Sequence, residues 1–149
     1  EGIEAGIISK TQRALSQNFS LVASKPIGEF CTPISKAYTL PATTDAATLR
    51  KLAAKRELPD VAIYRGGRLN VIGYVRVVEM LLGEDDELKV LPIPAISEKE
   101  FFGEALLQMQ TKHHTIVRVV GQYDKTVGLL SIDQLTDPLL KGTLNSLRR

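Results

Sequence analysis

A strand–turn–strand–helix unit occurs twice in the sequence, and this repetition constrains the fold more than any other feature. In residues 116–135, two β-branched runs flank a polar turn, and a helical pattern starts where the second run ends. Residues 61–82 show the same order around a Gly-Gly turn. Gly73 and Gly128 hold the same place in the two units, 55 positions apart. Similarity at a fixed spacing indicates an internal repeat, so we expect two similar halves.

Each unit is preceded by a helical pattern and a further short apolar run. We expect the leading strands at residues 38–40 and 88–92. The first helix is predicted to start with Thr44 as its cap, and the second with the pattern Ser97-x-x-Glu100, which matches a capping box. Both halves therefore read β-α-β-β-α, and the predicted fold class is mixed α+β.

The repeat divides the chain into four parts. We expect a helical N-terminal linker, two repeats and a tail, at residues 1–25, 26–84, 85–142 and 143–149. The N-terminal helix fits equally well a segment that leads away from the domain or one that covers its end. Asp137-Pro138 predicts a break in the last helix, because proline cannot donate a backbone hydrogen bond.

The composition of the chain argues against several kinds of protein. The net charge is +2 with both signs spread along the chain, which argues against a nucleic-acid partner. Cys31 is the only cysteine, so an internal disulfide is excluded. No apolar run approaches the roughly 18 residues that span a bilayer. Since Glu1 is not a native start residue, we expect a piece excised from a longer protein.

No set of catalytic residues emerges from the sequence. Gly-x-Ser-x-Gly, Cys-x-x-Cys and the Walker loop are all absent, so we expect no enzyme activity. His113 and His114 are neighbours near a strand start, where adjacent side chains face opposite ways, and a structural role is favoured over metal binding. The acidic run at residues 84–87 fits a solvated linker better than a metal site. We therefore predict no metal site.

The order of elements and the motifs resemble a tandem pair of cystathionine-β-synthase (CBS) domains. Residues 119–123 read Val-Val-Gly-Gln-Tyr and residues 128–131 read Gly-Leu-Leu-Ser. They are similar to the second CBS repeat of the CorC/hemolysin-C-like and cyclin M cation transporters. The Cys-Thr-Pro at residues 31–33 fits that family's Met-Thr-Pro, and His114 fits its usual histidine. The resemblance covers roughly residues 20–140.

This resemblance implies two repeats that pack through their sheets with pseudo-two-fold symmetry and leave two clefts for adenine nucleotides. In such clefts the hydroxyl group after the second strand meets phosphate, and the acid three residues later holds the ribose. By position, these roles fall to Arg76 and Glu79 in the first repeat and to Ser131 and Gln134 in the second. Thr32 would lie near the first cleft entrance and the residues around Pro92 near the second.

The chain departs from the family pattern at two of these positions. Arg76 replaces the hydroxyl residue; its guanidinium can hold phosphate or pair with Glu79 one turn later. Gln134 replaces the aspartate, and the loss of a charge-assisted bond costs about 1–3 kcal/mol. Ser131-x-x-Gln134 also matches a capping box, so these two residues fit a structural role equally well.

The resemblance implies a non-catalytic regulatory module on the cytosolic face of a membrane divalent-cation (Mg/Co) transporter or hemolysin-like protein. It would form a homodimer through its helices, contact the transmembrane domain of the full-length protein, and bind ATP or AMP with Mg²⁺. Two alternatives are a CBS module of a soluble nucleotide-metabolism enzyme and a module that serves only for association, with degenerate nucleotide sites.

Overall fold

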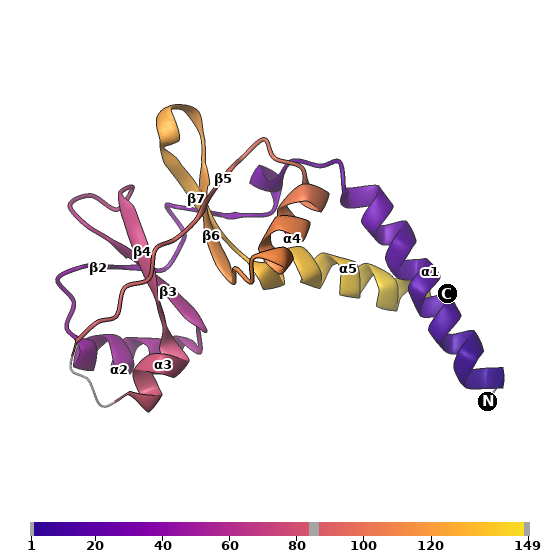
Figure 1. The fold of residues 1–149 in the computed structure, drawn as a ribbon, viewed down its shortest axis with the longest axis horizontal. Helices are drawn as coiled ribbons and strands as arrows, with labels where there is room; N and C mark the ends of the chain where they lie inside the picture. Colours follow the sequence, from indigo (N-terminus) through magenta and orange to yellow (C-terminus); the bar gives the residue numbers. More distant parts are fainter. Residues whose placement is uncertain (1, 84–86, 148–149) are drawn as a thin grey trace.

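Two small mixed sheets with their helices form the body of the protein, and two long helices extend from one end (Figure 1). The computed structural model describes residues 2–83 and 87–147. The two halves follow each other along the chain, and each contains one sheet. The predicted tandem β-α-β-β-α architecture is therefore confirmed.

The first repeat has a three-stranded sheet in the order β2-β3-β4. Strand β2 is parallel to β3, and β3 is antiparallel to β4. Its elements are β2 (Thr39–Pro41), α2 (Ala46–Arg56), β3 (Asp60–Tyr64), β4 (Val71–Arg76) and α3 (Val77–Leu82).

The second repeat has the same pairing among its own strands. Strand β5 is parallel to β6, and β6 is antiparallel to β7. The β3–β4 hairpin shifts register between Ile63 and Tyr64, and the β6–β7 hairpin shifts at the equivalent place, between Val119 and Val120. The elements are β5 (Ala95–Ser97), α4 (Phe102–Thr111), β6 (Ile116–Val120), η2 (Gln122–Asp124), β7 (Thr126–Ser131) and α5 (Ile132–Leu147).

Each sheet is extended by the segment that precedes the other repeat. Strand β1 (Thr32–Pro33) pairs antiparallel with β7 of the second repeat, and Leu91 forms an isolated antiparallel bridge with Tyr74 of the first. These segments cross at the two equivalent glycines. A Cβ atom on Gly128 would lie 2.6 Å from the Thr32 carbonyl oxygen, and one on Gly73 would lie 2.4 Å from the Leu91 carbonyl oxygen. Both positions therefore require glycine for the same reason, close approach of a backbone.

Three clusters of buried side chains hold the fold. One lies in each repeat, around Leu49 and Ile63 in the first and around Phe102 and Leu130 in the second. The third joins the repeats and contains Ala37, Ala62, Val71 and Leu129. Because this small cluster draws on both sheets, the two repeats pack as one body.

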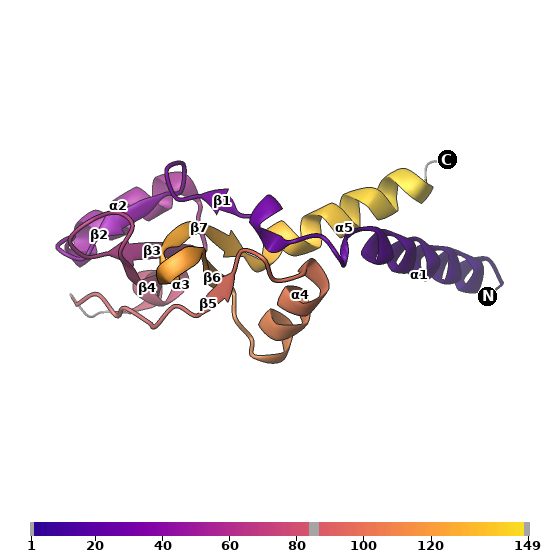
Figure 2. The same ribbon diagram turned by 90° about the horizontal axis from the view of Figure 1, so that it is seen from above.

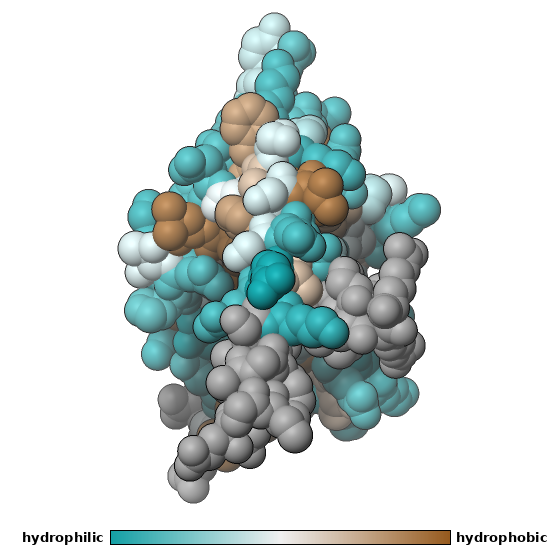
Figure 3. Space-filling model, turned by 90° about the vertical axis from the view of Figure 1, so that its right-hand side faces the viewer, coloured by the Kyte–Doolittle hydropathy of each residue, from teal (hydrophilic) through white to brown (hydrophobic). Residues whose placement is uncertain are grey.

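Helix α1 (Gly2–Val22) packs against α5 and α4, beyond the second sheet (Figure 2). The Phe19 ring contacts α4 closely enough that a Cβ on Gly103 would lie 3.2 Å from it. A short 3₁₀ turn, η1 (Ile27–Glu29), then leads to β1, with Ile27 fully buried. The surface at this end is mainly hydrophilic with separate hydrophobic areas (Figure 3). Its exposed large apolar side chains include Phe19, Leu21, Leu107 and Leu140.

Two predictions about the strand and helix starts of the second repeat are wrong. The leading strand is Ala95–Ser97, not residues 88–92, because the earlier segment is used by the first sheet through the Leu91 bridge. Ser97 does not begin a helix either. Its hydroxyl oxygen accepts from the Lys99 amide at 3.2 Å, and α4 starts at Phe102.

Two further details of the helices differ from expectation. Asp45, not Thr44, caps α2, since its carboxylate accepts from the Thr48 amide at 3.0 Å. Helix α5 continues through Pro138 instead of breaking there. The helix packs against α1 and α4, and Leu135 is fully buried; this tertiary contact outweighs one lost backbone bond.

Across the described residues, no helix is both long and apolar enough to cross a membrane. The predicted acidic linker falls largely outside those residues, since of positions 84–87 only Glu87 is described, and it is exposed.

Candidate functional site

The residue before α5 is hydrogen-bonded to a side chain in the first turn of that helix. Ser131 is the last residue of β7, and its backbone amide donates to Gln134 Oε1 at 2.8 Å. The Ser131 hydroxyl also donates to the same oxygen at 3.4 Å. The predicted capping interaction is therefore present in the direction from Gln134 back to Ser131.

Gln134 also ties this helix to the segment before the first repeat. Its Nε2 donates to Thr32 Oγ1 at 2.8 Å and to the Phe30 carbonyl at 3.4 Å. An aspartate could not donate these bonds, so the glutamine makes a link to Thr32 and Phe30 that an aspartate would not make. We call the contact of Gln134 with Ser131 and Thr32 the Gln134 clasp.

Beside this clasp, a groove runs along the junction of the two repeats. It consists of a cavity of about 340 Å³ and an adjoining one of about 270 Å³, which share Pro59, Asp60, Ser131 and Asp133. The larger cavity is lined by Thr32, Lys36, Ala37, Tyr38, Leu58, Pro59, Asp60, Ala62, Ile116, Leu129, Ser131, Asp133 and Gln134. The smaller one adds Arg76, Val78, Thr115 and Ile132. We call the two cavities together the junction groove.

Charges of both signs face the junction groove. Lys36 lines the larger cavity and Arg76 the smaller, whereas Asp60 and Asp133 line both. Burial raises the pKa of the Asp60 carboxyl, and the neighbouring Asp133 carboxylate raises it further; Thr115 and Arg76 act in the opposite direction. The two aspartates are therefore close enough to interact across the groove.

The equivalent corner of the first repeat is built differently. Arg76 ends β4, and its Nη1 lies 4.0 Å from Glu79 Oε1 in the first turn of α3. Both side chains are about half exposed, at 41% and 52%. They line a cavity of only about 80 Å³, together with Lys89 and others. This corner contains a loose surface ion pair where the second repeat has a part-buried hydrogen-bond network.

The structure thus brings together Thr32, Ser131 and Gln134, and separately Arg76 and Glu79. Thr32 lies with the second-repeat pair because β1 pairs with β7, and residues 89–91 lie near the first-repeat pair because Leu91 bridges to Tyr74. Arg76 reaches both corners, since it also lines the junction groove beside Ser131. Pro92 is exposed and lines none of these cavities.

Sequence reasoning missed Asp60, Lys36 and Asp133 as groove residues. Asp60 stands directly before the buried run Val61–Ile63, a position where a charged residue can mark the mouth of a cleft. Lys36 and Asp133 are exposed and gave no comparable signal, because only the packing of the two repeats brings them to one groove.

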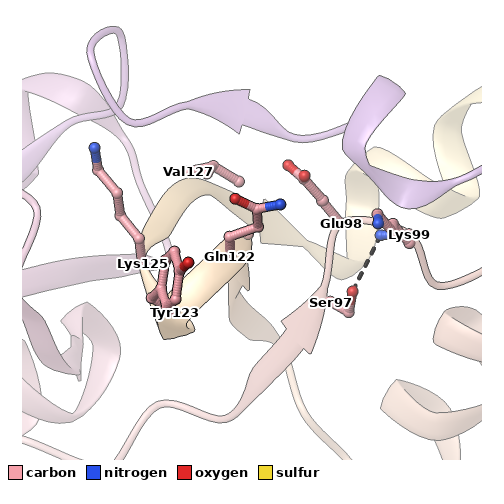
Figure 4. Close-up of a pocket in the computed structure, with 8 residues that line it drawn as sticks. Ser97, Glu98, Lys99, Gln122, Tyr123, Lys125 and Val127 are labelled. Atoms are coloured by element: carbon pink, nitrogen blue, oxygen red, sulfur yellow. Dashed lines mark hydrogen bonds between the residues drawn. The ribbon is translucent and has the colours of Figure 1, made fainter.

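A further cavity of about 490 Å³ lies at the opposite end of the second sheet, between the β6–β7 turn and the residues after β5 (Figure 4). Gln122, Tyr123 and Lys125 line one side, and Ser97, Glu98 and Lys99 the other. The Tyr123 side chain is almost fully exposed, at 99%. None of the residues predicted for nucleotide binding lines this cavity.

The two histidines and the cysteine do not line the junction groove. His113 lies exposed in a turn with φ 57°, and His114 follows it just before β6, so both lie near a strand start as the sequence predicted. Burial raises the pKa of the half-buried Cys31 thiol, so its thiolate form is disfavoured. Within residues 2–83 and 87–147, no three His, Cys, Asp or Glu side chains are grouped so as to hold a metal ion.

Comparison with known proteins identifies the fold. Neither a scan of protein-family models nor a search of curated proteins produced a match. Solved structures match well. The CBS domain of a bacterial CNNM/CorC-family Mg²⁺ transporter in complex with ATP aligns with a TM-score of 0.77 at 17% identity, covering 87% of this chain and 96% of that one.

Two other structures extend the likeness. A hemolysin-like CBS protein of Oenococcus oeni aligns with a TM-score of 0.75 at 14% identity, covering 84% of this chain and 97% of that one. A CBS-domain pair with bound AMP from Klebsiella pneumoniae aligns with a TM-score of 0.64 at 16% identity, covering 77% and 98%. The chain therefore has the fold of a CBS pair, of the kind found in CNNM/CorC transporters, at low sequence identity.

Proposed function

We propose that the protein is a non-catalytic regulatory CBS pair of a CorC-like divalent-cation transporter, which binds an adenine nucleotide and responds by changing its association. In this proposal residues 26–84 and 85–142 are the two repeats, and the module lies on the cytosolic face beside the transmembrane domain. The fold likeness to the ATP-bound CNNM/CorC domain over 96% of that chain is its main support.

The junction groove is the proposed nucleotide site. Thr32, Ser131 and Gln134 meet at its edge, and its walls include Ala37, Ala62 and other apolar side chains. A concave apolar slot with a few polar groups at one end is the usual form of a small-molecule site. A bound nucleotide shifts the protein between arrangements only by its difference in affinity for them.

Dimerisation through helices is part of the proposal. On the short helix α3, Val78, Leu81 and Leu82 are exposed at 61%, 57% and 81%. Three large apolar side chains on six residues form a surface that association would bury.

The Gln134 clasp favours a second candidate, a CBS pair that serves only for association. Both ends of the Gln134 side chain are already bonded within the chain. A ligand that needs this side chain has to replace those bonds. The third candidate is a sensor on a soluble enzyme. The full-length sequence distinguishes it from the first candidate, because several apolar spans of about 20 residues upstream of Glu1 would support a transporter.

Calorimetric titration with AMP and ATP, with and without Mg²⁺, tests the proposal. We expect dissociation constants no tighter than roughly tens of micromolar, because the ribose contact of an acid at position 134 is lost. Gln134→Asp should bind more tightly than the wild type. If neither protein binds an adenine nucleotide and the variant is only less stable, the association-only candidate is correct.

A further inference from the structure

We infer that the junction groove recognises the adenosine part of its ligand and gains nothing from the phosphates: without a divalent cation, adenosine binds more tightly than AMP, and AMP more tightly than ATP. This inference rests on the proposed function and specifies its ligand. It follows from three features of the groove.

The first feature is the Ser131 amide at the start of α5, which already has a hydrogen-bond partner. A phosphate at a helix N-terminus binds to amide groups that have no partner within the helix. Here the Ser131 amide donates to Gln134 Oε1 at 2.8 Å, and Gln134 is fixed at its other end by Thr32 at 2.8 Å. A phosphate that binds the Ser131 amide has to break the clasp, so it exchanges one hydrogen bond for another.

The second feature is the balance of charge. Asp60 and Asp133 line both cavities of the junction groove, against Lys36 in one and Arg76 in the other. Asp133 lies in the first turn of α5, where it already offsets the positive end of the helix dipole. Arg76 Nε is buried, and the tip of its guanidinium faces Glu79 at 4.0 Å. A phosphate group brings almost two negative charges, and no net positive charge awaits it.

The third feature is the apolar lining of the larger cavity. Ala37, Leu58, Ala62, Ile116 and Leu129 give the larger cavity an apolar lining that suits a flat base. The Asp60 carboxylate at its edge accepts hydrogen bonds from neutral donors such as ribose hydroxyls or an exocyclic amine. A nucleoside can use both the wall and the carboxylate without charge repulsion.

Titration calorimetry with adenosine, AMP and ATP in low-salt buffer containing a chelator tests this order. Adenosine should bind at least about tenfold more tightly than ATP, and the ratio should shrink at high salt, which screens the repulsion. In Asp60→Asn/Asp133→Asn, ATP should gain at least about tenfold relative to adenosine. Glu104→Gln removes one exposed charge from α4 outside the groove and should leave the ratio unchanged.

The outcomes separate the two proposals. If ATP binds as tightly as adenosine without a divalent cation, or if the double variant keeps the wild-type ratio, the inference is wrong while nucleotide binding stands. If no adenine compound binds, the proposed function is wrong and the inference falls with it. If the double variant unfolds, the ratio of ATP to adenosine affinity is measured in Asp133→Asn instead. The Asp133 side chain is exposed and is not part of the core, so this variant should fold.

Discussion

The two repeats share a backbone but differ at the end of their second strand. In both, a glycine in the hairpin lets the segment that precedes the other repeat come close. A Cβ atom added at Gly73 or Gly128 would lie 2.4 Å or 2.6 Å, respectively, from a backbone carbonyl oxygen of that segment. At the end of the same strand the first repeat has the half-exposed Arg76–Glu79 pair, and the second has the Gln134 clasp. The repeats are therefore alike where backbones touch and differ in the side chains at the clefts.

The largest expected effect tests whether the repeats unfold together. Ile63 and Leu130 are both fully buried, one in each core. Ile63→Ala and Leu130→Ala should each lower the free energy of unfolding by about 2–5 kcal/mol. Urea titration should show one transition at the same concentration by near-UV and far-UV circular dichroism, because the third cluster joins the halves. Two separate transitions in either variant would show that the repeats are independent.

The glycine pair tests the equivalence of the two hairpins. Gly73→Ala and Gly128→Ala should each cost about 1–3 kcal/mol, since the new Cβ pushes against a backbone carbonyl that cannot rotate away. Urea denaturation of the two variants gives the comparison. Gly67→Ala is the control, because nothing lies within 4 Å of a Cβ there. A harmless substitution at only one of the paired glycines contradicts the equivalence.

Unlike the paired glycines, the residues at the two clefts should contribute unequally to stability. Gln134→Ala removes the clasp, so the part-buried Thr32 hydroxyl and Ser131 amide lose their hydrogen-bond partner. The free energy of unfolding should fall by about 1–2 kcal/mol. Glu79→Ala removes an exposed pair and should change stability by less than about 0.5 kcal/mol. Thermal unfolding of both variants measures this, and equal losses would refute the asymmetry.

The smallest effect concerns Asp60 and depends on pH. Burial raises the pKa of its carboxyl in the folded protein above the unfolded value, so the folded state binds the proton more strongly. Its contribution to stability is therefore full below the unfolded pKa and is lost as pH rises through the folded pKa. Asp60→Asn should raise the melting temperature at pH 7 and have a smaller effect near pH 4. A variant that melts lower than the wild type at pH 7 would contradict this account.

Much of the fold was accessible from the sequence because local patterns determine it. The hairpins, their glycines and most helices follow from alternation, turn residues and helical spacing. The leading strand of the second repeat was misplaced because residues 88–92 and 95–97 are both short and apolar, and only the pairing of Leu91 with Tyr74 distinguishes them. The helix expected to break at Pro138 continues because α1, distant in sequence, packs against it.

The site could be predicted only in part. Ser131 and Gln134 were recognisable from their spacing, since a helix start determines their contact. The bond from Gln134 to Thr32 joins residues 102 positions apart, and the meeting of Lys36, Asp60 and Asp133 needs both repeats in place. No local pattern contains that information.

The exchange of edge segments also has a consequence for the order of events during synthesis. Strand β1 is synthesised well before its partner β7. Until β7 is made, β1 has no ladder to join, and a contact between such distant residues forms slowly. A nascent chain stalled before residue 126 should therefore remain sensitive to protease around Thr32 while its first sheet is already protected.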